Sequence, residues 1–287
     1  MYMQTTENET TFKPFDELVC SDNFMFAKVM EDPKLCKRVL ETLLDIKIER
    51  LSYPEGEKTI QVAPDAKAVR LDVHTADTHR DFDIEIQTTL YKELRLRSRY
   101  YQDMMDVDYL RKGHSYSELK ENFVIFICLE DLFGQGLPIY TFENTCNEDN
   151  NVKLEDKTFK VFYNCSKWKD VTQQQKSELL KFFLTDEGDT DLCSKLKKKE
   201  QRVKMTERAR KEYMDYCILA DSLKEQGKQQ GIAIGEKRGR SKAKLENAQN
   251  MLAMNLGTYE QIAQAVGLPL ETVQRLAEEL KAETVLQ

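Results

Sequence analysis

Two short segments of the chain alternate apolar and polar residues with the period of a β-strand. Residues 69–73 read Val-Arg-Leu-Asp-Val, and residues 82–87 read Phe-Asp-Ile-Glu-Ile-Gln. Successive side chains point to opposite faces of a strand, so each segment gathers its apolar residues on one face and its acids on the other. The stretch between them is short and polar, which predicts a hairpin. In an antiparallel hairpin Asp72 and Glu85 come within reach of one cation, and their oxygens are ligands that Mg²⁺ prefers.

Helix-like and strand-like patterns alternate along the first two thirds of the chain. The continuous apolar run over 122–129 suits a buried central strand. This alternation predicts an α/β domain in which helices flank a mixed sheet. The remaining expected elements are a loop and a helix within 15–30, helices over 34–44, 90–110 and 171–184, and strands over 46–52, 140–142 and 158–163.

The composition changes after residue 190, and three parts are expected. They are a domain over 1–190, a charged helical linker over 191–243 and a small helical hairpin over 244–287. Glycine recurs every four residues in the linker. Such a comb either lets two helices approach closely or marks a flexible connection, because each glycine costs a helix about 1 kcal/mol. The comb consists of Gly227, Gly231, Gly235 and Gly239.

The last part has the signals of two helices joined by a turn. A capping box spans Thr258 to Gln261, Gly267 closes the first helix and Pro269 stands at the start of the second. A second helix that reads DNA should be basic. This one is richer in glutamate than in basic residues. A hairpin for packing or dimerisation is therefore favoured over a DNA-reading motif.

Charge is distributed unevenly along the chain. The net charge is -7, yet residues 195–244 hold about 16 Lys or Arg against about 7 acids. Such a stretch either holds phosphates or forms a solvated helix. Seven cysteines without a C-x-x-C pair indicate a reduced, cytoplasmic protein, and three scattered histidines argue against a zinc site. No apolar run approaches the ~20 residues of a membrane helix, and the polar residues 1–11 argue against a signal peptide.

The hairpin resembles that of the PD-(D/E)XK nuclease superfamily, in which an Asp precedes a (D/E)-x-K motif on the next strand. Residues 85–87, Glu-Ile-Gln, stand for (D/E)-x-K, with Gln87 in place of Lys. The Ile-Glu-x-Gln form at 84–87 is similar to the branch of recombination-promoting nucleases and transposases. Three further stretches stand in the same order as in that branch, and the resemblance covers roughly residues 12–185. These stretches are 97–101, 112–119 and 133–140.

This resemblance implies a restriction-endonuclease-like core and a DNA endonuclease dependent on Mg²⁺ or Mn²⁺. The expected products are a 5′-phosphate and a 3′-hydroxyl, and the expected partners are DNA and a second copy of the chain. Asp72 and Glu85 would hold the metal. The catalytic set would be Asp72, Glu85, Gln87 and Asp22, and the substrate-binding residues would be Arg97 and Tyr100.

Each of the two best candidates for the metal site has a simpler alternative role. A carboxylate flanked by apolar residues on a strand is partly buried, and its unpaired charge is costly there. Metal binding removes that cost, but so does an ion pair, for example between Asp72 and Arg70. The same choice applies to Glu85. Asp83 shares the face of Glu85 one step earlier, and we expect it to be a charge at the rim.

The other candidates are equally open. Asp22 either supplies a third carboxylate or caps a helix. Arg97 either binds the scissile phosphate in a bidentate manner or pairs with Glu93, four residues earlier. Gln87 can orient a water molecule but cannot neutralise developing charge as Lys would.

The sequence is consistent with two functions. The first is a metal-dependent endonuclease that acts in recombination, in transposition or in the destruction of foreign DNA. The second is a catalytically inactive nucleic-acid-binding or assembly protein that keeps the nuclease fold. The chain has no Ser/His/Asp arrangement and no G-x-x-x-x-G-K-[ST] loop, which argues against acyl transfer and nucleotide hydrolysis.

Overall fold

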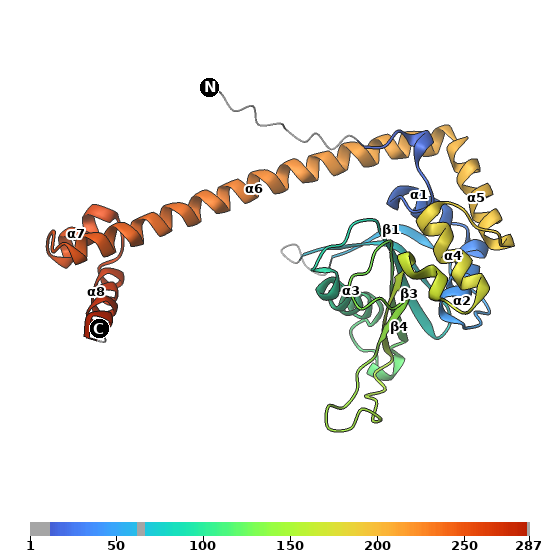
Figure 1. Cartoon of the computed structure of the whole chain (residues 1–287), viewed down its shortest axis with the longest axis horizontal. Helices are drawn as coiled ribbons and strands as arrows, with labels where there is room; N and C mark the ends of the chain where they lie inside the picture. Colours follow the sequence, from blue (N-terminus) through green and yellow to red (C-terminus); the bar gives the residue numbers. More distant parts are fainter. Residues whose placement is uncertain (1–11, 62–66, 286–287) are drawn as a thin grey trace. The chain divides into compact units, whose positions relative to one another are not determined.

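The computed structural model describes residues 12–61 and 67–285 of the 287-residue chain (Figure 1). The expectation of no signal peptide falls on residues 1–11, which lie outside the described residues. The chain divides into two compact units, Met1–Met214 and Asp215–Gln287. The helices are α1 Asn23–Met30, α2 Pro33–Leu44, α3 Leu94–Tyr109, α4 Gln174–Thr185, α5 Asp191–Lys204, α6 Glu207–Ala253, α7 Tyr259–Val266 and α8 Leu270–Val285. The strands are β1 Glu55–Ile60, β2 Val69–Ala76, β3 Arg80–Gln87, β4 Glu121–Cys128, β5 Ile139–Phe142 and β6 Thr158–Asn164.

A six-stranded sheet forms the centre of the first unit, with the order β1-β2-β3-β4-β6-β5. The β3–β4 and β4–β6 pairs are parallel, and the other three pairs are antiparallel. The sheet is therefore mixed, which confirms the predicted α/β class. The apolar run over 122–129 forms β4, and its last five residues, Val124–Cys128, are at most 1% exposed.

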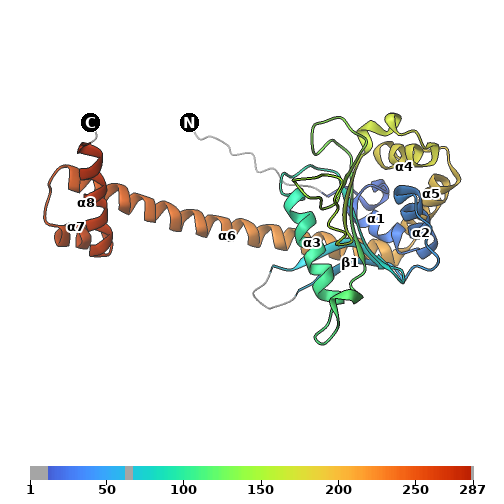
Figure 2. The ribbon, with the colours of Figure 1, turned by 90° about the horizontal axis from the view of Figure 1, so that it is seen from below.

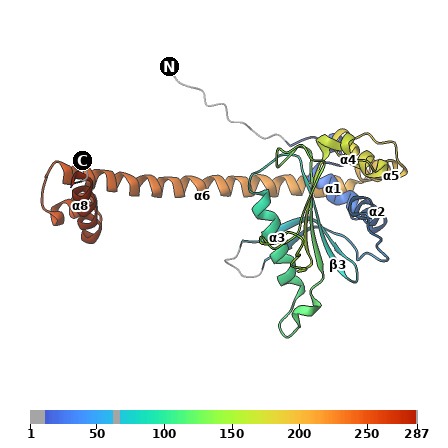
Figure 3. The same cartoon turned by 60° about the horizontal axis from the view of Figure 1, so that its bottom comes forward.

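Helices cover both faces of this sheet. α3 lies along one face, and α1, α2, α4 and α5 form a layer on the other (Figures 2 and 3). Leu94 and Met105 of α3 pack with Phe126 and Phe162 of the sheet in one apolar cluster. In the opposite layer α5 contacts α1, α2 and α4. The mixed sheet between two helical layers, with the long helical region that follows it, matches the restriction-endonuclease-like fold that the sequence predicts.

The predicted strand over 46–52 is wrong. This segment is extended, but side chains of α2 take part in its backbone hydrogen bonds: the Ile48 N–H donates to Glu41 Oε1 at 3.0 Å, and Lys37 donates to the Glu49 carbonyl at 3.1 Å. The edge strand is β1, a few residues later. Its sequence, Glu-Gly-Glu-Lys-Thr-Ile, lacks apolar alternation because most of its side chains are exposed or half-buried. Hydrophobic periodicity alone therefore missed it.

The second unit consists of most of α6 and a helical hairpin. α6 is continuous from Glu207 to Ala253, so the comb glycines lie inside a helix and the flexible-connection alternative is wrong. The capping box at Thr258 and the left-handed Gly267 (φ 64°) are as predicted. α7 and α8 pack against the end of α6 through a small apolar cluster. This cluster comprises Ala248, Ile262, Ala263, Val273 and Leu276. In the described ranges, no helix combines the length and apolar content that a membrane crossing requires.

Candidate active site

The hairpin carboxylates Asp72 and Glu85 meet where the regular backbone pairing of β2 and β3 ends. Backbone pairing joins residues 73–76 to 81–84, from Val73 opposite Ile84 outward. At the next position the Asp72 N–H donates to Glu85 Oε1 at 2.8 Å, and the Ile86 N–H donates to Asp72 Oδ2 at 3.1 Å. Side chains thus replace backbone carbonyls as acceptors. The structure brings Asp72 and Glu85 together as the hairpin pattern predicted, and the bonds to backbone amides fix their orientation.

Both carboxylates lie in a poorly solvated place. Glu85 is 1% exposed, and Asp72 is partly buried. Burial raises the pKa of Asp72 to about 6, against the opposing effects of the Ile86 N–H and the Arg97 guanidinium. Burial also raises the pKa of Glu85 well above its ordinary value, and the Asp72 and Asp83 charges add to that shift. The site therefore holds more negative charge than its neighbours compensate.

Asp83 is the third acid of the cluster, and the expectation that it is a rim charge is wrong. Its exposed fraction is 0%, because it lies opposite His74 of β2 and beside Val124 of β4. Within the described residues neither of its carboxylate oxygens accepts a hydrogen bond. Burial raises its pKa strongly, and the Asp72 and Asp81 carboxylates raise it further. The sequence alternation places Asp83 on the face of Glu85, but it does not reveal that β4 covers that position.

Arg97 is the cation that faces this cluster. Its Nη2 lies 3.4 Å from Glu85 Oε2 and 2.5 Å from the Tyr101 hydroxyl, and its guanidinium lies 5.1 Å from the centre of the Tyr101 ring. The ion pair with Glu93 is not the arrangement found. A guanidinium held by an aromatic ring and a single carboxylate keeps donors that a phosphate could accept. Arg70 instead pairs with Glu57 at 2.5 Å, so the alternative ion pair to Asp72 does not form.

Gln87 completes the row along β3. Its Nε2 lies 3.4 Å from Glu85 Oε2, and the residue is 6% exposed. An amide at this distance orients the carboxylate weakly without supplying charge. Tyr101 was missed by the sequence analysis, although its place four residues after Arg97 puts the two side chains on one helix face. Tyr100 instead donates to the Lys67 carbonyl at 2.7 Å.

Asp22 stands apart from these residues. It precedes α1, in the layer opposite α3, and its side chain makes no capping bond to that helix. Its Oδ1 lies 2.7 Å from Lys13 Nζ, and its Oδ2 accepts the Val19 N–H at 2.8 Å. In the described part of the chain no hydrogen bond or ion pair joins Asp22 to Asp72 or Glu85. Its catalytic role stays a prediction without a contact in its favour.

The donor set fits a hard divalent cation held partly by water. Mg²⁺ is commonly bound by one or two carboxylates and keeps several waters. Asp72 Oδ1 accepts no hydrogen bond from the residues described, and Asp83 has two unsatisfied oxygens close by. Over the same residues no group of three or more His, Cys, Asp or Glu side chains has a geometry ready to hold a metal. The site thus offers two carboxylates, Asp72 and Glu85, rather than a closed protein cage.

Comparison with known proteins shows which family the chain matches. A family model described as PD-(D/E)XK nuclease family transposase matches residues 23–216. The match begins at α1 and ends in the first turns of α6, so it covers the whole sheet and both helical layers. No curated protein and no solved structure matches the chain.

Proposed function

The chain belongs to the PD-(D/E)XK nuclease family transposases, and on this basis we propose that it is a metal-dependent DNA endonuclease that hydrolyses phosphodiester bonds. The observation that carries the proposal is the crowding of Asp72, Asp83 and Glu85 around one cation, Arg97. Uncompensated buried carboxylates are costly, and perturbed acids of this kind gather at functional sites. A divalent metal and a phosphate are the ligands that such a cluster suits.

Each residue of the cluster has a separate role in the proposed hydrolysis. Asp72 and Glu85 would hold Mg²⁺ or Mn²⁺, and a cation bound there would supply Lewis-acid activation of water and of the phosphoryl group. Gln87 orients the attacking water through its amide. Arg97 exchanges its long contact with Glu85 for the non-bridging oxygens of the scissile phosphate, where a guanidinium binds in a bidentate manner. Hydrolysis leaves a 5′-phosphate and a 3′-hydroxyl, as in the related nucleases, and serves recombination, transposition or the degradation of foreign DNA.

A catalytically inactive DNA-binding or assembly protein is the second candidate. The observation in its favour is Gln87, which occupies the position of the usual lysine and cannot neutralise charge in the transition state. No lysine ammonium contacts Asp72 or Glu85 in the regions that the structure covers. The two candidates differ in one property. Only the endonuclease gains cleavage activity from a divalent cation.

Incubation of supercoiled plasmid with the full chain and Mg²⁺ or Mn²⁺ tests the proposal. We expect nicked or linear product with wild type and none with Asp72→Ala. Glu93→Gln serves as the control, because Glu93 is an exposed acid four residues before Arg97. Thermal unfolding with and without the metal accompanies the assay, since a bound cation stabilises the folded state. Metal-induced stabilisation without any cleavage would favour the inactive binding protein.

Self-association is proposed for the second unit. Several apolar side chains of α6 are exposed in the single chain, among them Ile218, Leu223, Ile232 and Ile234. Four glycines in a helix make it marginal alone, so a second copy of the chain is the expected partner along α6. A chain that ends at Met214 should keep the sheet and both helical layers but sediment at a smaller oligomeric size. Equal oligomeric sizes for the two chains would contradict this.

A further inference from the structure

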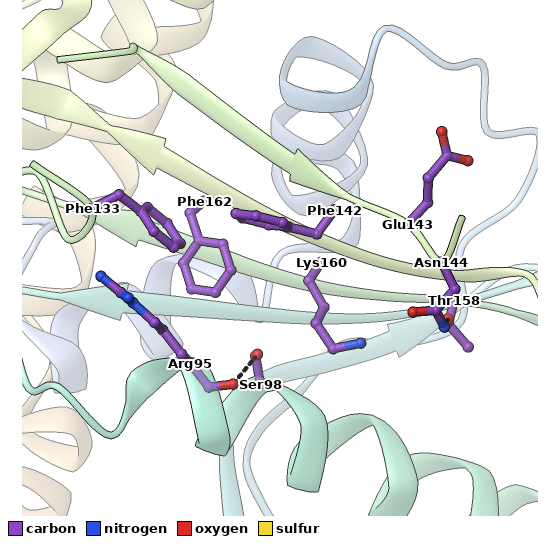
Figure 4. Close-up of a pocket in the computed structure, with 9 residues that line it drawn as sticks. All are labelled: Arg95, Ser98, Phe133, Phe142, Glu143, Asn144, Thr158, Lys160 and Phe162. Atoms are coloured by element: carbon purple, nitrogen blue, oxygen red, sulfur yellow. Dashed lines mark hydrogen bonds between the residues drawn. The ribbon is translucent and has the colours of Figure 1, made fainter. Parts of the chain in front are cut away.

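A pocket opens on the same face of the sheet as the carboxylate cluster. Its volume is about 310 Å³, which lies at the small end of the range for small-molecule sites. It lies between the first turns of α3, the loop after β4 and strands β5 and β6 (Figure 4). We call it the aromatic pocket, because three phenyl rings and two cations dominate its wall. The rings are those of Phe133, Phe142 and Phe162, and the cations are Arg95 and Lys160.

The three rings form a floor and two flanks. Phe162 is 3% exposed and stands nearly perpendicular to the other two rings, at 85° to Phe133 and 83° to Phe142. The centres of Phe133 and Phe142 are 5.1 Å apart. Phe142 is 42% exposed although it lies at the opening of a concave site. An exposed phenyl face beside a buried one is suited to stacking against a flat group that enters from solvent.

The charges around the pocket favour an anionic ligand. The Arg95 guanidinium lies 4.7 Å from the centre of the Phe133 ring and keeps one hydrogen bond, at 3.1 Å, to the Leu132 carbonyl. Lys160 reaches toward the pocket from β6 and hydrogen bonds to a side-chain oxygen of α3. The acid of the wall, Glu143, is paired with Lys153 at 2.6 Å. Aromatic faces next to cations are the lining that proteins use for unpaired nucleotides.

The pocket is joined to the candidate active site by a row of stacked rings. Glu85 of β3 is level with Phe126 of β4, which is level with Phe162 of β6. Phe126 and Phe162 stack at 5.1 Å and 7°, and Tyr101, which holds Arg97, stacks on Phe126 at 6.4 Å. Two strand spacings, about 10 Å, therefore separate the pocket from β3. This row is buried beneath α3, so a DNA strand reaches both sites by passing over the start of α3, where Arg97 faces the carboxylates and Arg95 lines the pocket.

We propose that the aromatic pocket binds an unpaired nucleobase of the substrate strand, one or two nucleotides from the scissile phosphate. The base stacks on Phe142 and Phe133, and the adjoining phosphate lies near Arg95 and Lys160. This inference rests on the proposed function, because the position of the base is counted from the phosphate that the nuclease cleaves. Its consequence is a preference for DNA with an unpaired base near the cut, since a base inside a duplex cannot enter without losing its own stacking.

Binding of a fluorescent DNA tests the pocket without any need for cleavage. The probe is a duplex with one bulged 2-aminopurine, titrated with the full chain in EDTA, and the fully paired duplex is its comparison. We expect the fluorescence of the bulged base to be quenched on binding, and the bulged DNA to bind at least about fivefold more tightly than the paired one. Phe142→Ala should abolish the quenching and weaken binding of the bulged DNA at least about fivefold.

Three further measurements make the outcome decisive. Phe142→Tyr should retain both effects, because it keeps a flat ring. Tyr116→Ala, which removes an aromatic residue that is 84% exposed outside the pocket, should change neither. Circular dichroism checks the fold of each variant, and exposure of the Phe142 side chain makes its loss tolerable.

The results separate this inference from the proposed function. If the wild type cleaves plasmid but binds bulged and paired DNA equally, the proposed base binding by the aromatic pocket is wrong and the proposed nuclease activity stands. Quenching that Phe142→Ala abolishes, in a wild type inactive with Mg²⁺ and Mn²⁺, would support the pocket and overturn the nuclease. Tighter binding of a bulged RNA of the same sequence would overturn the assignment to DNA.

Discussion

Asp72 and Glu85 lie opposite each other on β2 and β3, and the Asp72 N–H donates to Glu85 Oε1 at 2.8 Å. Asp72 in turn accepts the N–H of Ile86, the residue after Glu85. Each carboxylate is thus held by the backbone of the opposite strand, in place of the carbonyl that a continuous ladder would supply. The two acids are positioned before any cation binds, which reduces the ordering that metal binding requires.

The first prediction concerns isosteric replacement of these two acids. Asp72→Asn and Glu85→Gln keep an oxygen that can accept the opposing N–H, so both variants should fold. Each loses a charged metal ligand, and plasmid cleavage in Mg²⁺ should fall by at least about a hundredfold. Cleavage rates and thermal unfolding are measured side by side with Glu93→Gln. A variant that folds and cleaves at the wild-type rate would remove that carboxylate from the mechanism.

The second prediction concerns pH and the buried acid Asp83. A carboxyl whose pKa is raised in the folded state keeps its proton after the unfolded chain has lost it. The free energy of unfolding therefore falls as pH rises from 3.8, the ordinary pKa, to the raised pKa, which is about 6 for Asp72. Above the raised pKa this loss of stability stays constant. The pKa of Asp83 is raised in the same direction. In EDTA, Asp83→Asn should be more stable than wild type at pH 7, and the difference should vanish as pH falls to the ordinary carboxyl pKa of 3.8.

Urea unfolding midpoints at several pH values measure this difference. Asp103→Asn, which changes an exposed acid of α3, is the control and should leave the midpoints unchanged. Mg²⁺ should narrow the gap between Asp83→Asn and wild type, because the cation compensates the charge that the variant removes. A variant less stable than wild type at pH 7 in EDTA would contradict the view of Asp83 as an uncompensated charge.

Much of this arrangement could be predicted from the sequence, because the hairpin obeys a local rule. Alternation along β2 and β3 places Asp72 and Glu85 together whatever the rest of the fold does. The burial of Asp83 depends instead on β4, which is more than thirty residues away and pairs in parallel. Which tyrosine contacts Arg97, Tyr101 or Tyr100, depends on how α3 is rotated about its axis on the sheet. β1 was missed because an edge strand that is largely open to solvent has no apolar alternation to detect.

The third prediction separates the two roles open to Gln87. Its amide lies 3.4 Å from Glu85 Oε2 and carries no charge. Gln87→Ala should therefore lower the single-turnover cleavage rate, by about 10- to 100-fold, with little change in metal affinity. Gln87→Lys should be tolerated, because an ammonium beside Glu85 compensates charge that is now unpaired. Unchanged single-turnover cleavage by Gln87→Ala would show the residue to be structural.

The fourth prediction concerns cations on α5. Lys198 and Arg202 are exposed and line a groove against α2 with Lys34 and Arg38. If these side chains hold phosphates, replacing Lys198 and Arg202 by Gln should reduce the salt slope of DNA binding by about 0.9 for each contact. Cleavage at low salt should be nearly unchanged. Lys112→Gln together with Lys157→Gln is the control. An unchanged slope would leave the α5 cations as a solvated surface.

The last prediction concerns the glycine comb of α6. In the single chain a Cβ added at Gly231 or Gly235 meets no atom within 4 Å. Alanine at both positions should therefore strengthen an isolated helix by about 1 kcal/mol each. If the comb instead lets a second copy of α6 approach closely, the added methyl groups occupy the contact and the dimer weakens. We expect the second result, a loss of sedimenting mass in Gly231→Ala/Gly235→Ala at a concentration where wild type is dimeric. Alanine at the exposed position Gln229 is the control. A variant with higher thermal stability and unchanged mass would mean that α6 does not associate through these glycines.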